Sequence, residues 1–294
     1  MSLYKSRSKL LENERMAYNM VIPYVILIVG LILFLIYSNI KLSFVDSNGK
    51  FTLSNYAAVF NDALFYKSLS NTFFWVIFSV AGQIILGLII ALLLMQISHG
   101  QAIFRSMILI LPWATLDIVA GVMWKWMYND MYGVINDILM KVRIINQYIP
   151  WLALPTLAKV SVIIANIWKG FPLSSMFFLA RLQEIPEELY EACEIDGGGS
   201  INKFLHITLP QLRSVLITTL MLTTIWTINY FPLIYIMTGG GPNNATETVV
   251  TYIYRLSFKF LEYNRASALS NILFSLILII SGLFLWVINK EQAE

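Results

Sequence analysis

Polar, aromatic and small residues interrupt three otherwise apolar segments of this chain. Polar groups are expensive inside an apolar environment, so they mark positions where a polar solute could be bound. Amide and hydroxyl groups offer hydrogen bonds, and aromatic rings offer faces for stacking. The residues are Asp117, Asn166, Lys169, Gly170, Trp226, Thr227, Asn229 and Tyr230. We predict that they line a pathway for a solute; the alternative is that the Asn and Thr side chains join neighbouring helices.

Two of these residues, Asp117 and Lys169, carry opposite charges. One hypothesis is that they pair, directly or across the pathway, which would offset the cost of desolvating them. A second hypothesis is that Lys169 faces the pathway and favours an acidic solute. A third is that Lys169 snorkels or contacts backbone carbonyl groups.

The sequence contains no recognisable set of nucleophile, base and orienting group. Cys193 is the single cysteine, and the two histidines, His99 and His206, are far apart. The GxxxxGK[ST] pattern of a phosphate-binding loop does not occur. We therefore expect no disulfide, no metal site and no cofactor in this chain, and no enzymatic activity of its own.

The elements that must position these residues are long and apolar. The 294-residue chain is 58% hydrophobic and 13% charged, with a mean hydropathy of +0.69, whereas soluble domains are about 45–50% apolar and 25% charged. A helix needs roughly 20 apolar residues to span a bilayer. The segments that meet this requirement are 17–40, 70–96, 104–128, 156–180, 213–237 and 267–289. Since backbone groups in lipid must be satisfied internally, we predict an all-α membrane protein with six transmembrane helices.

The basic residues of the N-terminal segment set the predicted orientation. Residues 1–16 carry four Lys and Arg side chains, which places this tail in the cytoplasm by the positive-inside rule. An even number of spans returns the C-terminus to the same side. The predicted organisation is a tail at 1–16, a first helix at 17–40, an external loop at 41–69, a five-helix core at 70–289 and a tail at 290–294.

The segment 184–213, which this topology places in the cytoplasm, is too long and too charged to be a simple connection between spans. We predict a helix over 187–195, because a proline and two glutamates at its start suit the helix dipole. Glycines 197–199 would end that helix, since glycine permits left-handed termination. Ser200 would then cap a second short helix, and Pro210 would break it before the next span.

This segment resembles the Glu-Ala-Ala signature of the permease subunits of binding-protein-dependent, ATP-driven importers. The main departure is Cys193, which replaces the second alanine. The resemblance implies that the segment is a coupling helix seated in a groove of an ATPase subunit, whereas the plain alternative is an ordinary loop. The residues that it assigns to docking are Glu188, Glu191, Ala192, Cys193, Asp196, Gly197, Phe204 and Pro210.

Other runs resemble the sugar-importing branch of this family, which includes the larger maltose permease and the first glycerol-phosphate permease. Besides runs at 51–56, 104–105, 111–112, 120–121, 124–126 and 252–254, they are 71–72, 238–242 and 246–248. By resemblance to the maltose system, Asn166 and Gly170 match positions that line the sugar site. Residues 239–248 would then lie near the solute-binding protein.

The resemblance implies the type I ABC importer permease fold in a bacterial or archaeal cytoplasmic membrane, with both termini in the cytoplasm. The implied partners are a second related permease, two ATPase subunits that use ATP–Mg, an extracytoplasmic solute-binding protein, lipid and a carbohydrate. A net charge of +3 is too small to indicate a nucleic-acid partner. The alternatives are a permease for glycerol-phosphate, amino acids or polyamines, an ion-coupled secondary transporter and, least favoured, a membrane-embedded enzyme.

Overall fold

A computed structural model describes residues 2–46, 48–97 and 102–293. Within these ranges the regular elements are helices, together with one isolated β-bridge between Val45 and Phe51. Helices long and apolar enough to cross a membrane cover Asn19–Ser43, Ala63–Met95, Pro155–Leu182, Ser200–Ile228 and Tyr263–Lys290, and a bent pair covers Met107–Ala114 and Asp117–Met127. The predicted all-α architecture is confirmed, and the six predicted spans are recovered when the bent pair is taken as one span.

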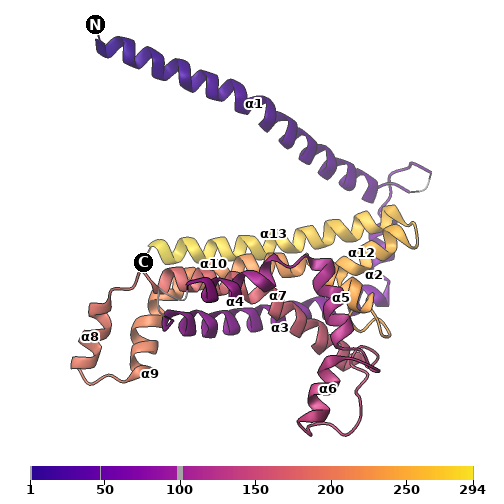
Figure 1. Ribbon diagram of the computed structural model, residues 1–294. Helices are drawn as coiled ribbons and strands as arrows, with labels where there is room; N and C mark the ends of the chain where they lie inside the picture. The colour runs from indigo at the N-terminus through magenta and orange to yellow at the C-terminus, as the bar shows by residue number, and fades with distance from the viewer. Residues whose placement is uncertain (1, 47, 98–101, 294) are drawn as a thin grey trace.

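The first helix, α1 (Ser2–Ser43), extends through the predicted tail, so residues 2–16 and the first span form one helix. The outer limits of the predicted tails, Met1 and Glu294, lie outside the described residues. The C-terminal end of α1 packs on α13 (Tyr263–Ala293), where Asn39 Nδ2 donates to Asn271 Oδ1 at 2.7 Å. The apolar stretch of α1 is otherwise uncovered and diverges from the other helices (Figure 1).

The centre of the molecule is the packing of α3 (Ala63–Met95) on α7 (Pro155–Leu182). Small residues allow the two backbones to approach closely, as is common between membrane helices. A Cβ atom added to Gly87 would lie 2.6 Å from Ser174 Cβ, and Ser174 is fully buried. Around this contact a core forms from Leu94, Phe178, Leu182 and Leu212.

The segment predicted as a single span over 104–128 is two helices, α4 (Ala102–Ala114) and α5 (Asp117–Met127), at an angle of 98°. This corrects the prediction. Pro112 lies in the last turn of α4, where its missing N–H and its ring weaken the helix. Pro172, by contrast, lies inside α7, which continues through that residue as one helix.

The segment predicted as one span over 213–237 is also interrupted, which corrects a second prediction. Three residues separate the end of the helix α10 (Leu209–Ile228) from Pro232, the first residue of α11 (Pro232–Thr238). Pro232 has no N–H with which to continue the hydrogen bonding of α10, so a break here is physically expected.

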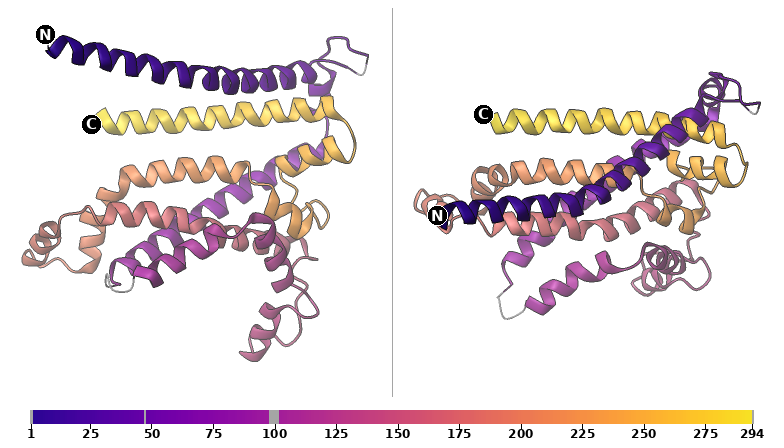
Figure 2. Two further views of the ribbon diagram at one scale, coloured as in Figure 1. Left: turned by 45° about the horizontal axis from the view of Figure 1, so that its top comes forward. Right: turned by 90° about the horizontal axis from the view of Figure 1, so that it is seen from above.

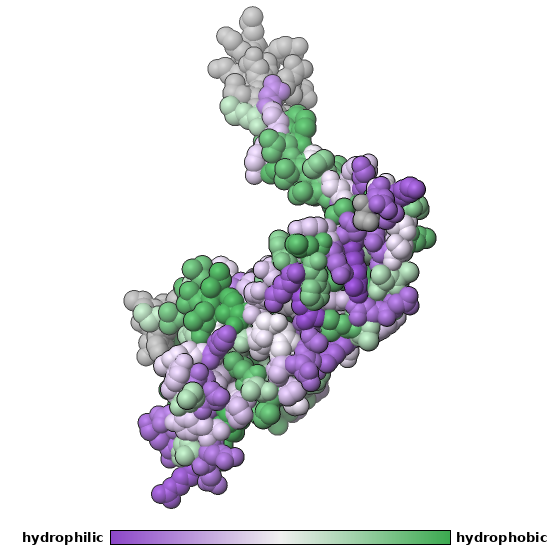
Figure 3. Space-filling view, turned by 90° about the vertical axis from the view of Figure 1, so that its right-hand side faces the viewer, coloured by the Kyte–Doolittle hydropathy of each residue, from purple (hydrophilic) through white to green (hydrophobic). Residues whose placement is uncertain are grey.

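The remaining elements lie at the two ends of the bundle. One end carries α2 (Ser54–Phe60), α6 (Val134–Lys141) and α12 (Val249–Phe258). The other carries α8 (Glu187–Ile195), α9 (Ser200–Lys203) and the π-helix η2 (Phe204–Thr208), together with both termini (Figures 1 and 2). Seen from the α2–α6–α12 end, hydrophilic and hydrophobic residues are interspersed over the surface, whereas the exposed part of α1 is mainly hydrophobic (Figure 3).

Candidate functional site

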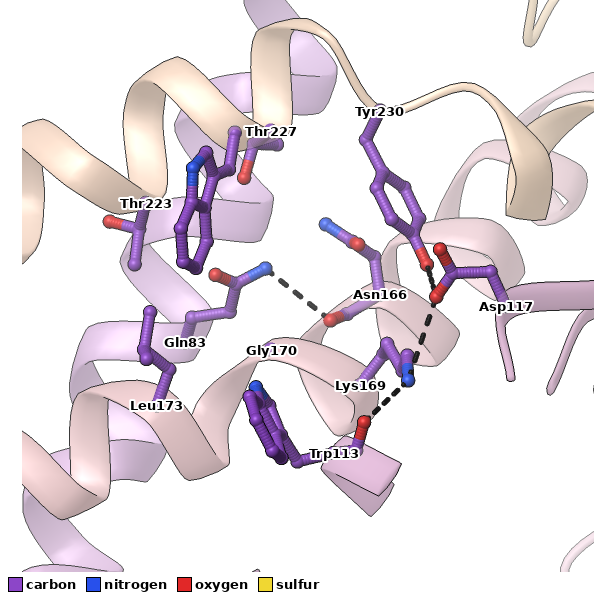
Figure 4. A pocket seen from close by; sticks show the side chains of 11 residues that line it. Gln83, Trp113, Asp117, Asn166, Lys169, Gly170, Leu173, Thr223, Thr227 and Tyr230 are labelled. Carbon is purple, nitrogen blue, oxygen red and sulfur yellow. Dashed lines mark hydrogen bonds and ion pairs between the residues drawn. The ribbon is translucent and has the colours of Figure 1, made fainter. Parts of the chain in front are cut away.

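A cavity of about 270 Å³ opens between α3, α5, α7 and α10 (Figure 4). Seven of the eight residues predicted from their polarity to line a pathway contribute to its wall: Asp117, Asn166, Lys169, Gly170, Trp226, Thr227 and Tyr230. The eighth, Asn229, is not part of the wall. Its side-chain amide instead donates to the Ile225 carbonyl of the preceding helical turn at 3.0 Å. The folded chain therefore brings together residues that are more than 100 positions apart.

The sequence reasoning missed four lining residues, Gln83, Trp113, Leu173 and Thr223. Gln83 is an amide in the middle of the apolar helix α3 and is only 4% exposed, so the rule that flagged Asn166 would also have found it. Leu173 carries no polar signal, and its place in the wall depends on how α7 is rotated in the bundle.

Two helix breaks meet at this cavity. The bend between α4 and α5 brings Trp113 and Asp117 to the wall, and the break between α10 and α11 brings Tyr230. Irregular backbone at membrane depth is tolerated where it lines a cavity, and broken helices commonly form binding sites in transporters. The cavity thus lies where the fold exposes backbone that regular spans would hide.

Lys169, in the middle of α7, binds the exposed end of α4. Its ammonium group donates to the backbone carbonyls of Pro112 at 3.2 Å and Trp113 at 3.0 Å, and also to that of Thr115. The last carbonyl groups of a helix have no partner within the helix, and a cation there also suits the helix dipole. Lys169 therefore satisfies backbone groups that the bend leaves open.

Asp117 is the first residue of α5, where a negative charge suits the positive end of the helix. Its Oδ1 atom lies 3.5 Å from Lys169 Nζ and accepts a hydrogen bond from the Tyr230 hydroxyl at 2.8 Å (Figure 4). The geometry combines two of the alternatives drawn from the sequence, the ion pair and the carbonyl contacts. The resulting Tyr230–Asp117–Lys169 network joins the two helix breaks.

Asn166 supplies an unused hydrogen-bond donor. Its Nδ2 atom is buried without a partner among the residues that the structure describes, while its backbone carbonyl accepts from Gln83 Nε2 at 3.3 Å. Trp113 and Trp226 are 53% and 56% exposed, so their rings are available for stacking. A buried donor without a partner is costly in a folded protein, and a bound ligand would remove that cost.

Gly170 allows α7 to approach α3 at the cavity. A Cβ atom at this position would overlap the side-chain amide of Gln83. Glycine therefore keeps Gln83 in position to bond the Asn166 carbonyl.

The predicted cytoplasmic element 184–213 has the helix–glycine–helix arrangement. Its first helix, α8, spans Glu187–Ile195 as predicted, and Gly197 adopts the left-handed φ of +80° that ends it. Most of the docking residues named above are exposed, whereas Cys193 and Phe204 are half-buried. The structure describes the shape of this element, and its docking role stays a prediction.

Two local predictions within this element were wrong. Ser200 is the first residue of α9 rather than its cap, which is Gly199 in an extended conformation. Pro210 does not break the second helix, since Ser200–Ile228 forms one continuous helical run. The wide turn of η2 immediately precedes α10, and the changed bonding pattern of a π-helix accommodates a proline whose N–H is missing.

Two polar contacts hold α8 against α9 and η2. The Tyr190 hydroxyl lies 3.1 Å from Thr208 Oγ1, and Lys203 forms an ion pair with Glu194 across the glycine turn. Tyr190 also packs against the core, but much of the element is open, with Ile195 and Ile201 86% and 75% exposed. Exposed apolar side chains on a charged element are typical of an interaction surface.

At the opposite end, the loop between α11 and α12 is held by internal bonds. Gly239 and Gly240 both adopt positive φ, which is the geometry of a tight turn. Asn71 Nδ2 donates to the carbonyls of Asn244 and Glu247 at 3.0 and 2.9 Å. Runs 71–72 and 238–248, singled out separately in the sequence, thus form one structure.

Glu247 is buried within this loop at 1% exposure and forms an ion pair with Arg255 at 3.1 Å. Burial raises the pKa of the Glu247 carboxyl, and the positive charge of Arg255 opposes that shift. A buried pair of this kind holds the loop in one conformation as long as both partners remain.

No cluster of three or more His, Cys, Asp or Glu side chains suited to a metal ion occurs among the described residues. His99, one of the two histidines, lies outside those residues.

Comparison with known proteins gives the chain a family. The family of binding-protein-dependent transport system inner membrane components matches residues 115–289. The chain is 35% identical to the trehalose/maltose transport system permease MalF of Thermococcus litoralis, over 95% of this chain and 96% of that protein. It is 33% identical to the lactose permease LacF of Rhizobium radiobacter, over 92% and 93%, and 34% identical to the sulfoquinovosyl glycerol permease SmoG of Agrobacterium fabrum, over 81% and 76%.

Solved structures agree on the fold. A chain of a bacterial ABC transporter that imports the acidic polysaccharide alginate superposes with a TM-score of 0.79 at 20% identity, covering 99% of both chains. The chain therefore has the type I ABC importer permease fold, and it is a multi-pass protein of the inner membrane. It belongs to the family of binding-protein-dependent transport system inner membrane components.

Proposed function

We propose that this chain is one of two permease subunits of an ATP-driven, binding-protein-dependent importer of carbohydrates. The observation that carries the proposal is Asn166, a residue of the cavity wall whose buried Nδ2 atom has no partner among the described residues. A sugar hydroxyl would accept its hydrogen bond, and the exposed rings of Trp113 and Trp226 would stack on the sugar. Relatives named for trehalose/maltose, lactose and sulfoquinovosyl glycerol support this cargo class.

A second permease would complete the pathway. The cavity of about 270 Å³ is slightly smaller than the about 300–1,000 Å³ of typical ligand pockets. A cavity of this size suits a half-site that closes against a related subunit.

The α8–α9 element would seat in a groove of an ATPase subunit, which binds ATP–Mg. In this arrangement α8, α9 and both termini face the cytoplasm, and the α11–α12 loop faces the solute-binding protein outside. The docking residues proposed from the sequence remain Glu188, Glu191, Ala192, Cys193, Asp196, Gly197, Phe204 and Pro210.

A continuous helical run would connect the docking element to the cavity. Ser200–Ile228 contains 29 residues, so at about 1.5 Å per residue it extends roughly 40 Å. Its first turn belongs to the docking element, and Thr223, Trp226 and Thr227 near its end line the cavity. Closure of the ATPase subunits would move this rod and so open the cavity to the other side of the membrane.

The test is ATP-driven uptake of a labelled carbohydrate by the assembled importer in liposomes. We expect Asn166→Ala to reduce uptake at least tenfold, because it removes the free donor. Asn229→Ala is the matched control, since Asn229 lies outside the cavity wall and bonds within its own helix. Equal uptake in the two variants would contradict the role of the cavity.

A further inference from the structure

The cavity contains one cation and one anion, and the structure uses them differently. Lys169 and Asp117 both lie in the wall, but the Lys169 side chain is only 12% exposed whereas that of Asp117 is 40% exposed. A ligand in the cavity would therefore contact the carboxylate more readily than the ammonium group.

The hydrogen-bonding capacity of Lys169 is already used. An ammonium group has three donors, and three backbone carbonyls at the end of α4 accept from it, those of Pro112, Trp113 and Thr115. Asp117 Oδ1 lies 3.5 Å from Lys169 Nζ, and its negative charge offsets that of the ammonium group. A substrate carboxylate could bind Lys169 only if the end of α4 lost a partner, which is costly at membrane depth.

Asp117 has one oxygen left. Its Oδ1 atom is engaged by both Lys169 and Tyr230, whereas Oδ2 accepts no hydrogen bond from the residues described (Figure 4). An ionised carboxylate oxygen is a strong acceptor for hydroxyl groups and repels a nearby anion. The charged group that this wall offers to a ligand is thus the negative carboxylate of Asp117.

We infer that this chain's wall of the pathway selects a neutral, polyhydroxylated ligand over an acidic one, with Asp117 as the residue that sets this preference. The inference rests on the proposed function and narrows it. Asn166 Nδ2 donates to one hydroxyl of the sugar, and Asp117 Oδ2 accepts from another. Lys169 closes the helix bend and does not contact the cargo.

The experiment measures equilibrium binding of labelled maltotriose and trigalacturonate, trisaccharides without and with carboxylates, to the whole importer in lipid nanodiscs. The solute-binding protein is omitted, so that its own selectivity does not enter. At low salt we expect maltotriose to bind about tenfold more tightly, which corresponds to a modest repulsion from one partly neutralised charge. In Asp117→Asn the ratio of the affinities for maltotriose and trigalacturonate should shrink to about threefold or less.

Asp130→Asn is the matched control, because Asp130 lies on the exposed turn after α5 and outside this cavity, and it should leave the difference unchanged. If Asp117→Asn fails to assemble, the wild-type complex still gives a test, since added salt screens the repulsion and should narrow the difference. Equal or tighter binding of trigalacturonate, or a difference that neither Asp117→Asn nor salt alters, would overturn the inference and leave the proposed function standing. Absence of binding and uptake for both trisaccharides would overturn the proposed function itself.

Discussion

The α8–α9 element and the cavity differ in how far their polar and charged groups are buried and paired. In α8 no residue is buried, and its link to α9 is held by a glycine turn and the Lys203–Glu194 ion pair. In the cavity, Asp117, Lys169 and Tyr230 satisfy one another and the open end of α4. The first region presents unsatisfied surface to water, where a partner can reach it, while the second hides charge inside the bundle.

This difference means that similar substitutions should have different consequences in the two regions. A change in the cavity network should damage the fold first and transport second. A change in the α8–α9 element should leave the fold intact and weaken the contact with the partner. The following predictions test that contrast.

The largest effect is expected for Lys169→Met. It leaves the α4 carbonyls and Asp117 without their partner, which should lower the free energy of unfolding by about 3 kcal/mol. Lys159→Met is the matched control on the same helix, because among the described residues Lys159 makes a cation–π contact, 5.4 Å from the Phe74 ring centre, and no hydrogen bond to a helix end. Thermal unfolding of the purified complex measures both variants, and equal losses of stability would contradict the structural role of Lys169.

A smaller effect is expected for Gly197→Ala in the α8–α9 element. Gly197 has a φ of +80° with no atom near a new Cβ, so the penalty comes from the backbone alone, at about 1–2 kcal/mol. Gly199→Ala is the control, because its site is equally open and its φ is −79°. We expect Gly197→Ala to lower recovery of the ATPase with the tagged permease about tenfold, while the permease still folds and its melting temperature falls by only a few degrees. Identical recovery in the two variants would argue that the shape of the turn does not matter for docking.

The smallest effect is expected for Glu194→Gln, which removes the ion pair with Lys203. The Glu194 side chain is 65% exposed, and exposed ion pairs contribute about 0–1 kcal/mol. Recovery of the ATPase should change by less than about threefold. A loss as large as that of Gly197→Ala would show that this pair, rather than the glycine turn, holds α8 in place.

The sequence predicted the exposed region and the composition of the cavity better than the course of the helices around it. The helix over 187–195 was predictable because its proline, acidic residues and glycine turn are local signals. Seven cavity residues were predictable because polarity in an apolar segment is also local. Gln83 was equally visible and was overlooked.

The two helix breaks were harder to predict because apolar segments of span length look continuous in sequence. The bend after Ala114 depends on Lys169, more than 50 residues away, which binds the carbonyls that the bend leaves open. Pro210 was misread for the opposite reason, since a proline signals a break but the π-helix before it lets the helix continue. In both cases tertiary or backbone context overrides the local signal.

The most direct test of the account is uptake of labelled maltotriose into liposomes that hold this chain and its second permease, with the solute-binding protein outside, and with or without the ATPase subunits and enclosed ATP. We predict uptake only when both the ATPase and ATP are present. Asn166→Ala should abolish uptake although the ATPase stays bound. Glu191→Lys should abolish uptake because the ATPase no longer binds. Sustained uptake by the permeases without ATPase or ATP would contradict the claim that the cavity and the α8–α9 element are two parts of one ATP-driven importer.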